Sequence, residues 1–251
     1  MKILITFAVA AEFAAWRRRH DFRQVAHDPF VLYACEIAGS PVRVVLTGMG
    51  TRAATEAVCW ALTSPADICI SSGLAGALNP ELEVGNVLAA RLVCQAEREL
   101  AVASDRQLLA VARDAGARQV ERLLTSERLV VNAADKMALA GEADAVEMES
   151  FVILAEAARH GVRAVAVRAV SDLPSGTLPY DFERACNARG QIRLSALVAD
   201  VIRRPQRLPA MWHFARDCRF AARKLADFLD DYLNLLNARL DLSQSEMVAA
   251  T

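Results

Sequence analysis

Short apolar runs recur along residues 1–170, separated for the most part by stretches with a different spacing of apolar residues. Runs of this length that are rich in valine, isoleucine and leucine are typical of buried β-strands. The predicted strands cover Ile3–Val9, Val31–Ile37, Val42–Thr47, Ile68–Ser71, Asn86–Val93, Leu123–Val131 and Ala164–Val170. Their regular recurrence predicts an α/β fold.

The stretches between the runs carry apolar residues three and four positions apart, the spacing of a helix that buries one face. The predicted helices cover Thr51–Leu62, Asp105–Ala115, Ala133–Ala140, Phe151–His160 and Gln191–Ile202. Residues 1–202 contain no long internal repeat and no low-complexity linker. We therefore expect one domain there, built around one core.

Residues 203–251 follow another pattern and are predicted to form a helical C-terminal extension. From Pro209 to Leu240 apolar residues recur at helical spacing and basic residues gather near the beginning, which predicts one long amphipathic helix or a broken pair. We favour packing of the apolar stripe on the domain or on a second subunit. The alternative is peripheral contact of residues 205–240 with the inner membrane surface, through a basic, tryptophan-containing first half. Acidic residues argue against membrane contact for the second half: Asp227, Asp230 and Asp231.

Composition narrows the class of protein. The chain has 251 residues, of which 54% are hydrophobic, and a formal net charge of −1, so it has no overall positive field to hold nucleic acid. Its six cysteines form no CxxC pair and its four histidines show no ligand spacing. This pattern indicates free thiols in a reducing, cytoplasmic compartment and no metal site.

The N-terminal apolar run invites a signal-peptide interpretation, which we reject. The run is only nine residues long, Glu12 interrupts it, and three arginines follow at 17–19. A first buried strand fits better. No other segment reaches the roughly 18 apolar residues that a membrane span needs.

The segment from Val146 to Asp172 is the most informative about chemistry, because it places three carboxylates around one predicted pocket. Glu147 and Glu149 lie where a predicted helix opens, and Asp172 follows the strand to which that helix leads. Because ligands of α/β sheets bind beyond the carboxyl ends of the strands, we expect Asp172 to serve chemistry and at least one glutamate to grip hydroxyl groups. The alternative is that the glutamates complement the helix macrodipole and Asp172 is an N-cap.

Two glycine-containing stretches follow predicted strands. Gly48-Met49-Gly50, with Thr51 as the expected N-cap, leads into a helix whose first amides could face an anion, and Gly73-Leu74-Ala75-Gly76 is expected to form a similar turn. Neither is a GxGxxG fingerprint, so a nicotinamide-dependent dehydrogenase is disfavoured.

The order of these motifs resembles the nucleoside phosphorylase and nucleosidase superfamily, in particular the methylthioadenosine/adenosylhomocysteine nucleosidases. The resemblance rests on FAVAAEF around Glu12, TGMGTRAA around Gly48, SSGLAGALNPELEVGNVL from Ser71, and VEMES with VRAVSD. Residues 130–150 (VVNAADKMALAGEADAVEMES) and 202–217 (IRRPQRLPAMWHFARD) are most similar to the hopanoid-biosynthesis phosphorylases, which act on adenosylhopane. The resemblance implies a single three-layer α/β/α domain with a mixed central sheet, and a homo-oligomer.

The resemblance also implies roles for individual residues. Cleaving an N-ribosidic bond requires a proton donor to the base, a grip on the ribose and a nucleophile. Asp172 matches the acid that protonates purine N7, a task that needs a raised pKa or a shared proton near neutrality. Glu12 matches the residue that polarises the attacking water. Glu149 matches the carboxylate that accepts the ribose 2′ and 3′ hydroxyl hydrogens, with Met148 packing under the sugar. The implied base pocket consists of Leu129, Val130, Ser171 and Glu147.

The chain also departs from the superfamily pattern. Leu74 replaces a frequent serine, and the stretch after Thr125 lacks the usual phenylalanine, which implies a more apolar pocket. No cofactor is implied, and phosphate enters as a co-substrate through the resemblance alone. The residues that could surround phosphate or another nucleophile are Gly48, Gly50, Gly73, Leu74, Arg52 and Arg168.

Together these inferences predict an enzyme that releases adenine from a 5′-substituted adenosine, namely adenosylhopane, by phosphorolysis. One alternative is a water-dependent nucleosidase of the methylthioadenosine/adenosylhomocysteine type. The other is a non-catalytic nucleoside-binding protein. The joint presence of Glu12, Glu149 and Asp172 argues against the second alternative, because a binding module needs no proton donor.

Overall fold

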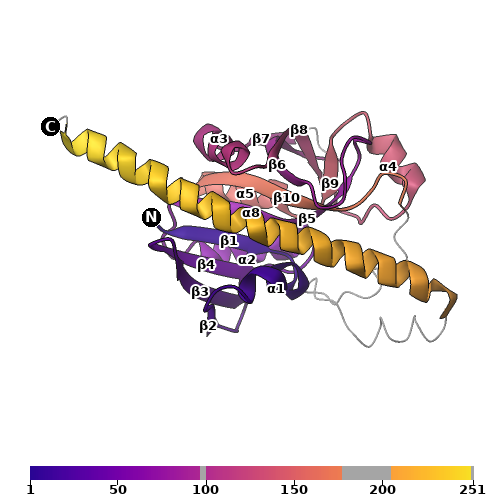
Figure 1. Ribbon diagram of the computed structural model, residues 1–251, viewed down its shortest axis with the longest axis horizontal. Coiled ribbons are helices and arrows are strands. Elements are labelled where there is room, and N and C mark those ends of the chain that lie inside the picture. The colour runs from indigo at the N-terminus through magenta and orange to yellow at the C-terminus, as the bar shows by residue number, and fades with distance from the viewer. Residues whose placement is uncertain (97–99, 177–204, 250–251) are drawn as a thin grey trace.

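The computed structural model describes residues 1–96, 100–176 and 205–249, and they form a mixed ten-stranded sheet with helices on both faces (Figure 1). The strands are β1 Ile3–Phe7, β2 Arg23–Ala26, β3 Val31–Ile37, β4 Ser40–Leu46, β5 Ile68–Ala77, β6 Val87–Gln95, β7 Leu100–Ala103, β8 Arg118–Thr125, β9 Ala145–Glu147 and β10 Arg163–Asp172. The helical segments are α1 Ala10–Arg17, α2 Thr51–Ala61, α3 Arg106–Asp114, α4 Ala133–Leu139, α5 Ser150–Arg159, the short 3₁₀ segment η1 Pro205–Arg207 and α8 Leu208–Ala249.

The strands pair in the order β10-β6-β8-β9-β5-β1-β4-β3-β2, with β7 beside β6. Strand β10 also pairs with β5, so β5, β10, β6, β8 and β9 close into a ring. Pairs such as β1–β5 and β5–β10 are parallel, whereas β10–β6 and β5–β9 are antiparallel. The predicted mixed sheet is confirmed.

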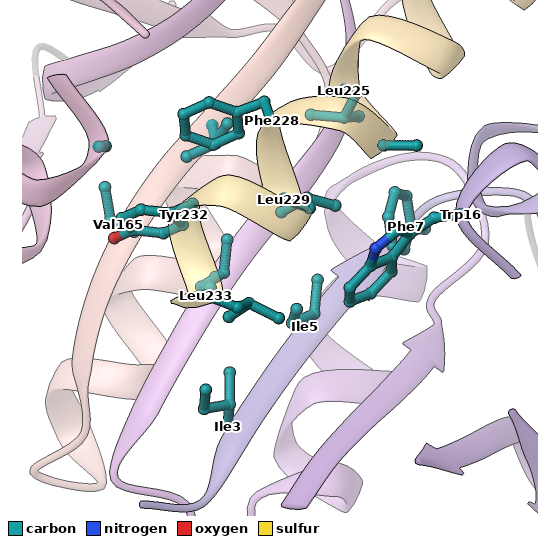
Figure 2. Packing of buried hydrophobic residues seen from close by; sticks show 14 of the residues in the cluster. Ile3, Ile5, Phe7, Trp16, Val165, Leu225, Phe228, Leu229, Tyr232 and Leu233 are labelled. Atoms are coloured by element: carbon teal, nitrogen blue, oxygen red, sulfur yellow. The ribbon is translucent and has the colours of Figure 1, made fainter. Parts of the chain in front are cut away.

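Two hydrophobic clusters cover the two faces of the sheet. Helices α2 and α5 contribute small and aliphatic residues to one cluster, including Ala57 and Leu154. Helices α1, α3 and α8 contribute to the other, where Leu225, Leu229 and Leu233 of α8 lie against residues of β1 (Figure 2). The three-layer α/β/α architecture is therefore confirmed.

Helix α8 is one continuous helix and not a broken pair, and it crosses the sheet face beside α1 (Figure 1). Polar groups tie it down as well: Trp16 Nε1 donates to Asp230 Oδ1 over 2.6 Å, and the buried Tyr232 hydroxyl donates to the Leu108 carbonyl over 2.9 Å. Its apolar stripe thus packs on the chain's own domain, as favoured from the sequence. The predicted boundary between residues 202 and 203 falls outside the described residues and stays a prediction, and the predicted helix Gln191–Ile202 lies outside them too.

Several predicted element boundaries are wrong, for identifiable reasons. The strand expected over Leu123–Val131 is β8, which begins at Arg118 and ends at Thr125 because Ser126 Oγ accepts the Arg128 amide in a turn. Strand β1 ends at Phe7 because the Glu12 carboxylate accepts the amides of Ala8 and Val9 and starts α1.

The glycine stretches also differ from expectation. Residues 73–76 form no turn, because β5 continues to Ala77 and its glycines leave room for side chains of the neighbouring strand β10. A β-carbon on Gly73 would lie 2.2 Å from Arg168 Nη1. The turn at Gly48–Gly50 does lead from β4 to α2, but Gly50 is the N-cap, at φ 90°, and Thr51 is the first helical residue.

Within the described residues, no helix is long and apolar enough to span a membrane, and no cluster of three histidine, cysteine, aspartate or glutamate side chains could hold a metal ion. The five described cysteines are free thiols.

Candidate active site

A cavity of about 520 Å³ lies where β5 and β10 end, beside the start of α1 and the β9–α5 junction. Parallel strands direct their carboxyl ends to one edge, which is where α/β folds place ligands. Eight residues predicted from the sequence line this cavity: Glu12, Leu74, Leu129, Glu147, Met148, Glu149, Ser171 and Asp172. The first turns of α8 complete the wall with Met211, Phe214, Ala215 and Cys218.

Glu12 lies in the first turn of α1 and accepts three backbone hydrogen bonds. Its Oε2 accepts from the amides of Ala8 and Val9 over 3.0 and 3.3 Å, and its Oε1 accepts from the Leu74 amide over 3.0 Å. Burial raises the pKa of Glu12, and the nearby Arg168 charge offsets part of that rise. A carboxylate held rigidly with a raised pKa is suited to take up a proton near neutrality.

Arg168 is a buried cation behind the cavity wall, with about 1% of its surface exposed. Its Nη2 lies 2.5 Å from Glu147 Oε2 and 2.8 Å from Ser150 Oγ. Glu147 also accepts the amides of Glu149 and Ser150 and the Thr125 hydroxyl. Glu147 therefore anchors the β9–α5 junction, and its carboxylate is occupied by the protein itself.

Glu149 is the N-cap of α5 and is buried, with one carboxylate oxygen 2.8 Å from the Gly50 amide that donates to it. Its other oxygen lies 3.8 Å from Arg168 Nη2. Burial, followed by the neighbouring Glu147 charge, raises the pKa of Glu149 to about 8, against the pull of Arg168 and Gly50. The group that accepts the amide at the start of α2 is thus a side chain of the protein.

Asp172 ends β10 with its carboxylate at the cavity and about 14% of the side chain exposed. Ser171 Oγ donates to Asp172 Oδ1 over 2.6 Å, and the ammonium of the fully buried Lys136 donates to Asp172 Oδ2. Gly76 allows this arrangement, since a β-carbon there would lie 2.9 Å from Asp172 Oδ2. Asp172 is not a helix N-cap in the described part of the chain, because it belongs to a strand.

Other predicted residues lie away from the cavity. The Arg52 side chain is about 89% exposed and pairs with Glu56, so Arg52 does not face the site. Val130 packs beside a small cluster around Leu124 and Val146. Gly48, Gly50 and Gly73 do not line the cavity, although Gly50 reaches it through its hydrogen bond to Glu149.

Sequence reasoning missed Lys136 and the cavity-facing residues of α8. Lys136 is 36 positions from Asp172, and nothing in the sequence around it marks it as buried. For α8 a usable signal existed: Met211, Ala215 and Cys218 recur at helical spacing, but the pattern could not show what they face.

A family model described as the phosphorylase superfamily matches residues 2–203. The chain belongs to the phosphorylase superfamily. Its fold and its family together identify the protein as a glycosyl-bond-cleaving enzyme of the nucleoside phosphorylase or nucleosidase kind.

Solved structures share the fold of this superfamily member over nearly its whole length. A mutant futalosine hydrolase of Helicobacter pylori is 17% identical with a TM-score of 0.71, covering 93% of this chain and 99% of its own. The 5′-methylthioadenosine/S-adenosylhomocysteine nucleosidase of Neisseria meningitidis, solved with methylthio-immucillin-A, is 21% identical with a TM-score of 0.69, covering 93% and 98%. The corresponding nucleosidase of S. pneumoniae, solved with a transition-state inhibitor, is 20% identical with a TM-score of 0.70, covering 94% and 100%.

Proposed function

We propose that the protein cleaves the N-ribosidic bond of a 5′-substituted adenosine and releases adenine. One observation carries the proposal: three carboxylates, those of Glu12, Glu149 and Asp172, line the same cavity from three separate elements. Cleavage of this bond needs a proton donor, a ribose grip and a group that handles the nucleophile. A site that only binds a nucleoside has no need for the first or the third.

In the proposed reaction the C1′–N9 electron pair moves into the purine while positive charge builds on the ribose. Asp172 delivers a proton to N7, which makes the base a better leaving group. Glu149 accepts hydrogen bonds from the 2′ and 3′ hydroxyls, with Met148 beneath the sugar. Glu12 takes a proton from the nucleophile as it attacks C1′, a task that its raised pKa supports.

The resemblance to hopanoid phosphorylases predicts phosphate as that nucleophile, whereas the polar groups of the site favour water. The amides of Gly50 and Leu74 already donate to carboxylates, and Arg168 is paired with Glu147. A phosphate dianion would have to displace a carboxylate from one of these donors before it could be bound. We therefore infer that water is the nucleophile, and we keep phosphorolysis as the second candidate reaction.

The part of the cavity next to α8 supports an apolar 5′ substituent. Met211, Phe214 and Ala215 line it, and Leu74 stands where the superfamily often has serine. Burial raises the pKa of the Cys218 thiol to about 12, so this thiol also stays neutral. Such a wall suits the hydrocarbon of adenosylhopane better than the short methylthio group.

We further propose that the beginning of α8 contacts the inner membrane surface from the cytoplasmic side. Leu208 and Trp212 are about 48% and 58% exposed, and Arg216 and Arg219 lie on the same stretch. Exposed apolar side chains beside arginines suit an anionic lipid surface. A second copy of the chain in a homo-oligomer would cover the same residues, and the two occupants are distinguished by the liposome experiment described in the Discussion.

The function is tested by incubating the purified protein with adenosylhopane or methylthioadenosine, each with and without phosphate. Release of adenine with free ribosylhopane, independent of phosphate, would support hydrolysis of the lipid substrate. A phosphorylated sugar product that requires phosphate would favour phosphorolysis. If neither nucleoside yields adenine, the proposal fails.

A further inference from the structure

Lys136 is a fully buried lysine whose ammonium reaches the wall of the cavity. It lies on α4, the short helix between β8 and β9, where Asn132 caps the helix by accepting the Asp135 amide over 2.8 Å. The ammonium donates to Asp172 Oδ2 and, over 2.8 Å, to the Leu173 carbonyl. Burying an ammonium is unfavourable unless it forms such hydrogen bonds, so Lys136 depends on Asp172 and on the Leu173 carbonyl.

The pairing has a chemical consequence for the proposed acid. A carboxylate that accepts hydrogen bonds from an ammonium carries no proton of its own to donate. The Ser171 hydroxyl donates a hydrogen bond to the other carboxylate oxygen over 2.6 Å. A proton that reaches the purine through Asp172 must therefore come from a neighbour, and Lys136 is the cation in contact with it.

We propose that Lys136 positions Asp172 and supplies the proton that Asp172 passes to the leaving purine. This inference rests on the proposed function and extends it to the origin of the proton. As the C1′–N9 bond breaks, its electron pair moves into the purine, Lys136 transfers a proton to the Asp172 carboxylate, and Asp172 passes a proton on to N7. Asp172 ends as a carboxylate and Lys136 as a neutral amine, which regains its proton from solvent when adenine leaves.

Other charged or titratable groups face the pair from the surrounding elements, and none of them replaces Lys136. Glu12 on α1 and Glu149 at the start of α5 are carboxylates engaged by backbone amides. The Cys218 thiol faces the cavity from α8, and Arg219 beside it is exposed with its Nε donating to the Ala215 carbonyl. Arg168 is bound to Glu147 on the far side of the wall.

The decisive experiment compares two leaving groups at pH 8. Adenine must be protonated to depart, whereas 4-nitrophenolate departs without a proton. The first substrate is therefore whichever of adenosylhopane and methylthioadenosine the wild type cleaves, and the second is 4-nitrophenyl riboside. We expect Lys136→Met to lower kcat about 100-fold on the adenosine, the scale of general acid catalysis, and less than about threefold on the nitrophenyl riboside. Asp172→Asn should show the same split.

Two further variants separate proton supply from other effects. Lys136→Arg keeps the charge but cannot give up a proton, so it should lose adenosine cleavage as Lys136→Met does. Met137→Ala is the matched control on the exposed side of α4 and should keep both activities. Equal loss on both substrates in Lys136→Met, or recovery of adenosine cleavage in Lys136→Arg, would overturn the proposal.

The pairing itself is tested without any substrate. The chain has three lysines, Lys2, Lys136 and Lys224, so ¹³Cε-labelled lysine gives three resonances that substitutions assign. We expect the Lys136 resonance to move in Asp172→Asn while the other two stay in place. An unmoved Lys136 resonance would refute the pairing, whereas a moved resonance in a protein that releases no adenine would refute only the proposed function.

Discussion

The folded protein disfavours the charged form of Glu149. Its pKa rises from the usual 4.5 to about 8, so between these values the folded state keeps a proton that the unfolded chain releases. The stability that this proton provides is present in full below pH 4.5 and is lost as the pH rises through about 8, by at most about 1.4 kcal/mol per pH unit.

We therefore expect that stability falls less steeply with rising pH in Glu149→Gln, because glutamine cannot ionise. The Tm of the wild type should fall relative to that of the variant as the pH is raised from 5 to 8, as measured by calorimetry at several pH values. Glu81→Gln, at an exposed carboxylate, is the control and should follow the wild type. Parallel curves for wild type and Glu149→Gln would contradict the assignment.

Gly76 is where a single methyl group would displace the proposed acid. A β-carbon there would lie 2.9 Å from Asp172 Oδ2, so Gly76→Ala should shift the carboxylate and lower kcat for adenine release by about 100-fold. Gly141→Ala is the matched control, because no atom lies within 4 Å of the added carbon. The expected result is a loss of kcat confined to Gly76→Ala, and retained activity would show that Asp172 does not need its present position.

At this scale the sequence predicted the acidic residues of the candidate site and missed Lys136, the cation that pairs with Asp172. Glu12, Glu149 and Asp172 follow or end strands of a sheet whose edge the hydrophobic pattern already located. Lys136 could not be found in this way, because its contact depends on how the chain between β8 and β9 folds back. The pattern also could not tell exposed Arg52 from buried Arg168, although the apolar strand around Arg168 was a usable signal.

Among the elements, α8 depends on buried polar contacts as well as on apolar packing. Tyr232→Phe removes the hydroxyl that donates to the Leu108 carbonyl and leaves that acceptor buried, so we expect a loss of about 1 kcal/mol in the free energy of unfolding. Denaturant titration measures the loss, and Asp231→Asn at an exposed position of the same helix is the control. A Tyr232→Phe variant as stable as wild type would show that the hydroxyl contributes nothing net.

Most helices of the domain were predictable within the described residues, and the shortest strands were not. Helices α2, α3 and α5 have enough turns for their periodicity to appear, and they lie within a residue or two of the prediction. Strands β2, β7 and β9 have only three or four residues and show no pattern. The end of β1 was missed because it is set by the Glu12 carboxylate. The length of β5 was missed because its glycines make room for neighbouring side chains and do not form a turn.

For the whole molecule, membrane contact is tested with substitutions and not with deletion of residues 205–251, because α8 belongs to the core. Leu208→Ser combined with Trp212→Ser should weaken binding to liposomes of phosphatidylglycerol and phosphatidylcholine by tenfold or more, since each apolar side chain contributes about 1.5 kcal/mol or more when buried. Val25→Ser, at an exposed apolar residue of β2, is the control.

Two outcomes would contradict membrane contact. Equal partitioning of the wild type and the double variant would show that these side chains do not enter the lipid. A change in sedimentation from oligomer to monomer in the double variant, without any liposome binding by the wild type, would assign the same surface to a second copy of the chain.

Helix α8 divides the evolutionary freedom of this protein along its length. Positions such as Leu225, Leu229 and Leu233 are held by the core and tolerate little change. Met211, Phe214 and Ala215, only a few turns earlier, face the cavity and are spared that constraint. A lineage could therefore retune the substrate it accepts by drift at one end of the helix, while purifying selection at the other end preserves a foldable chain.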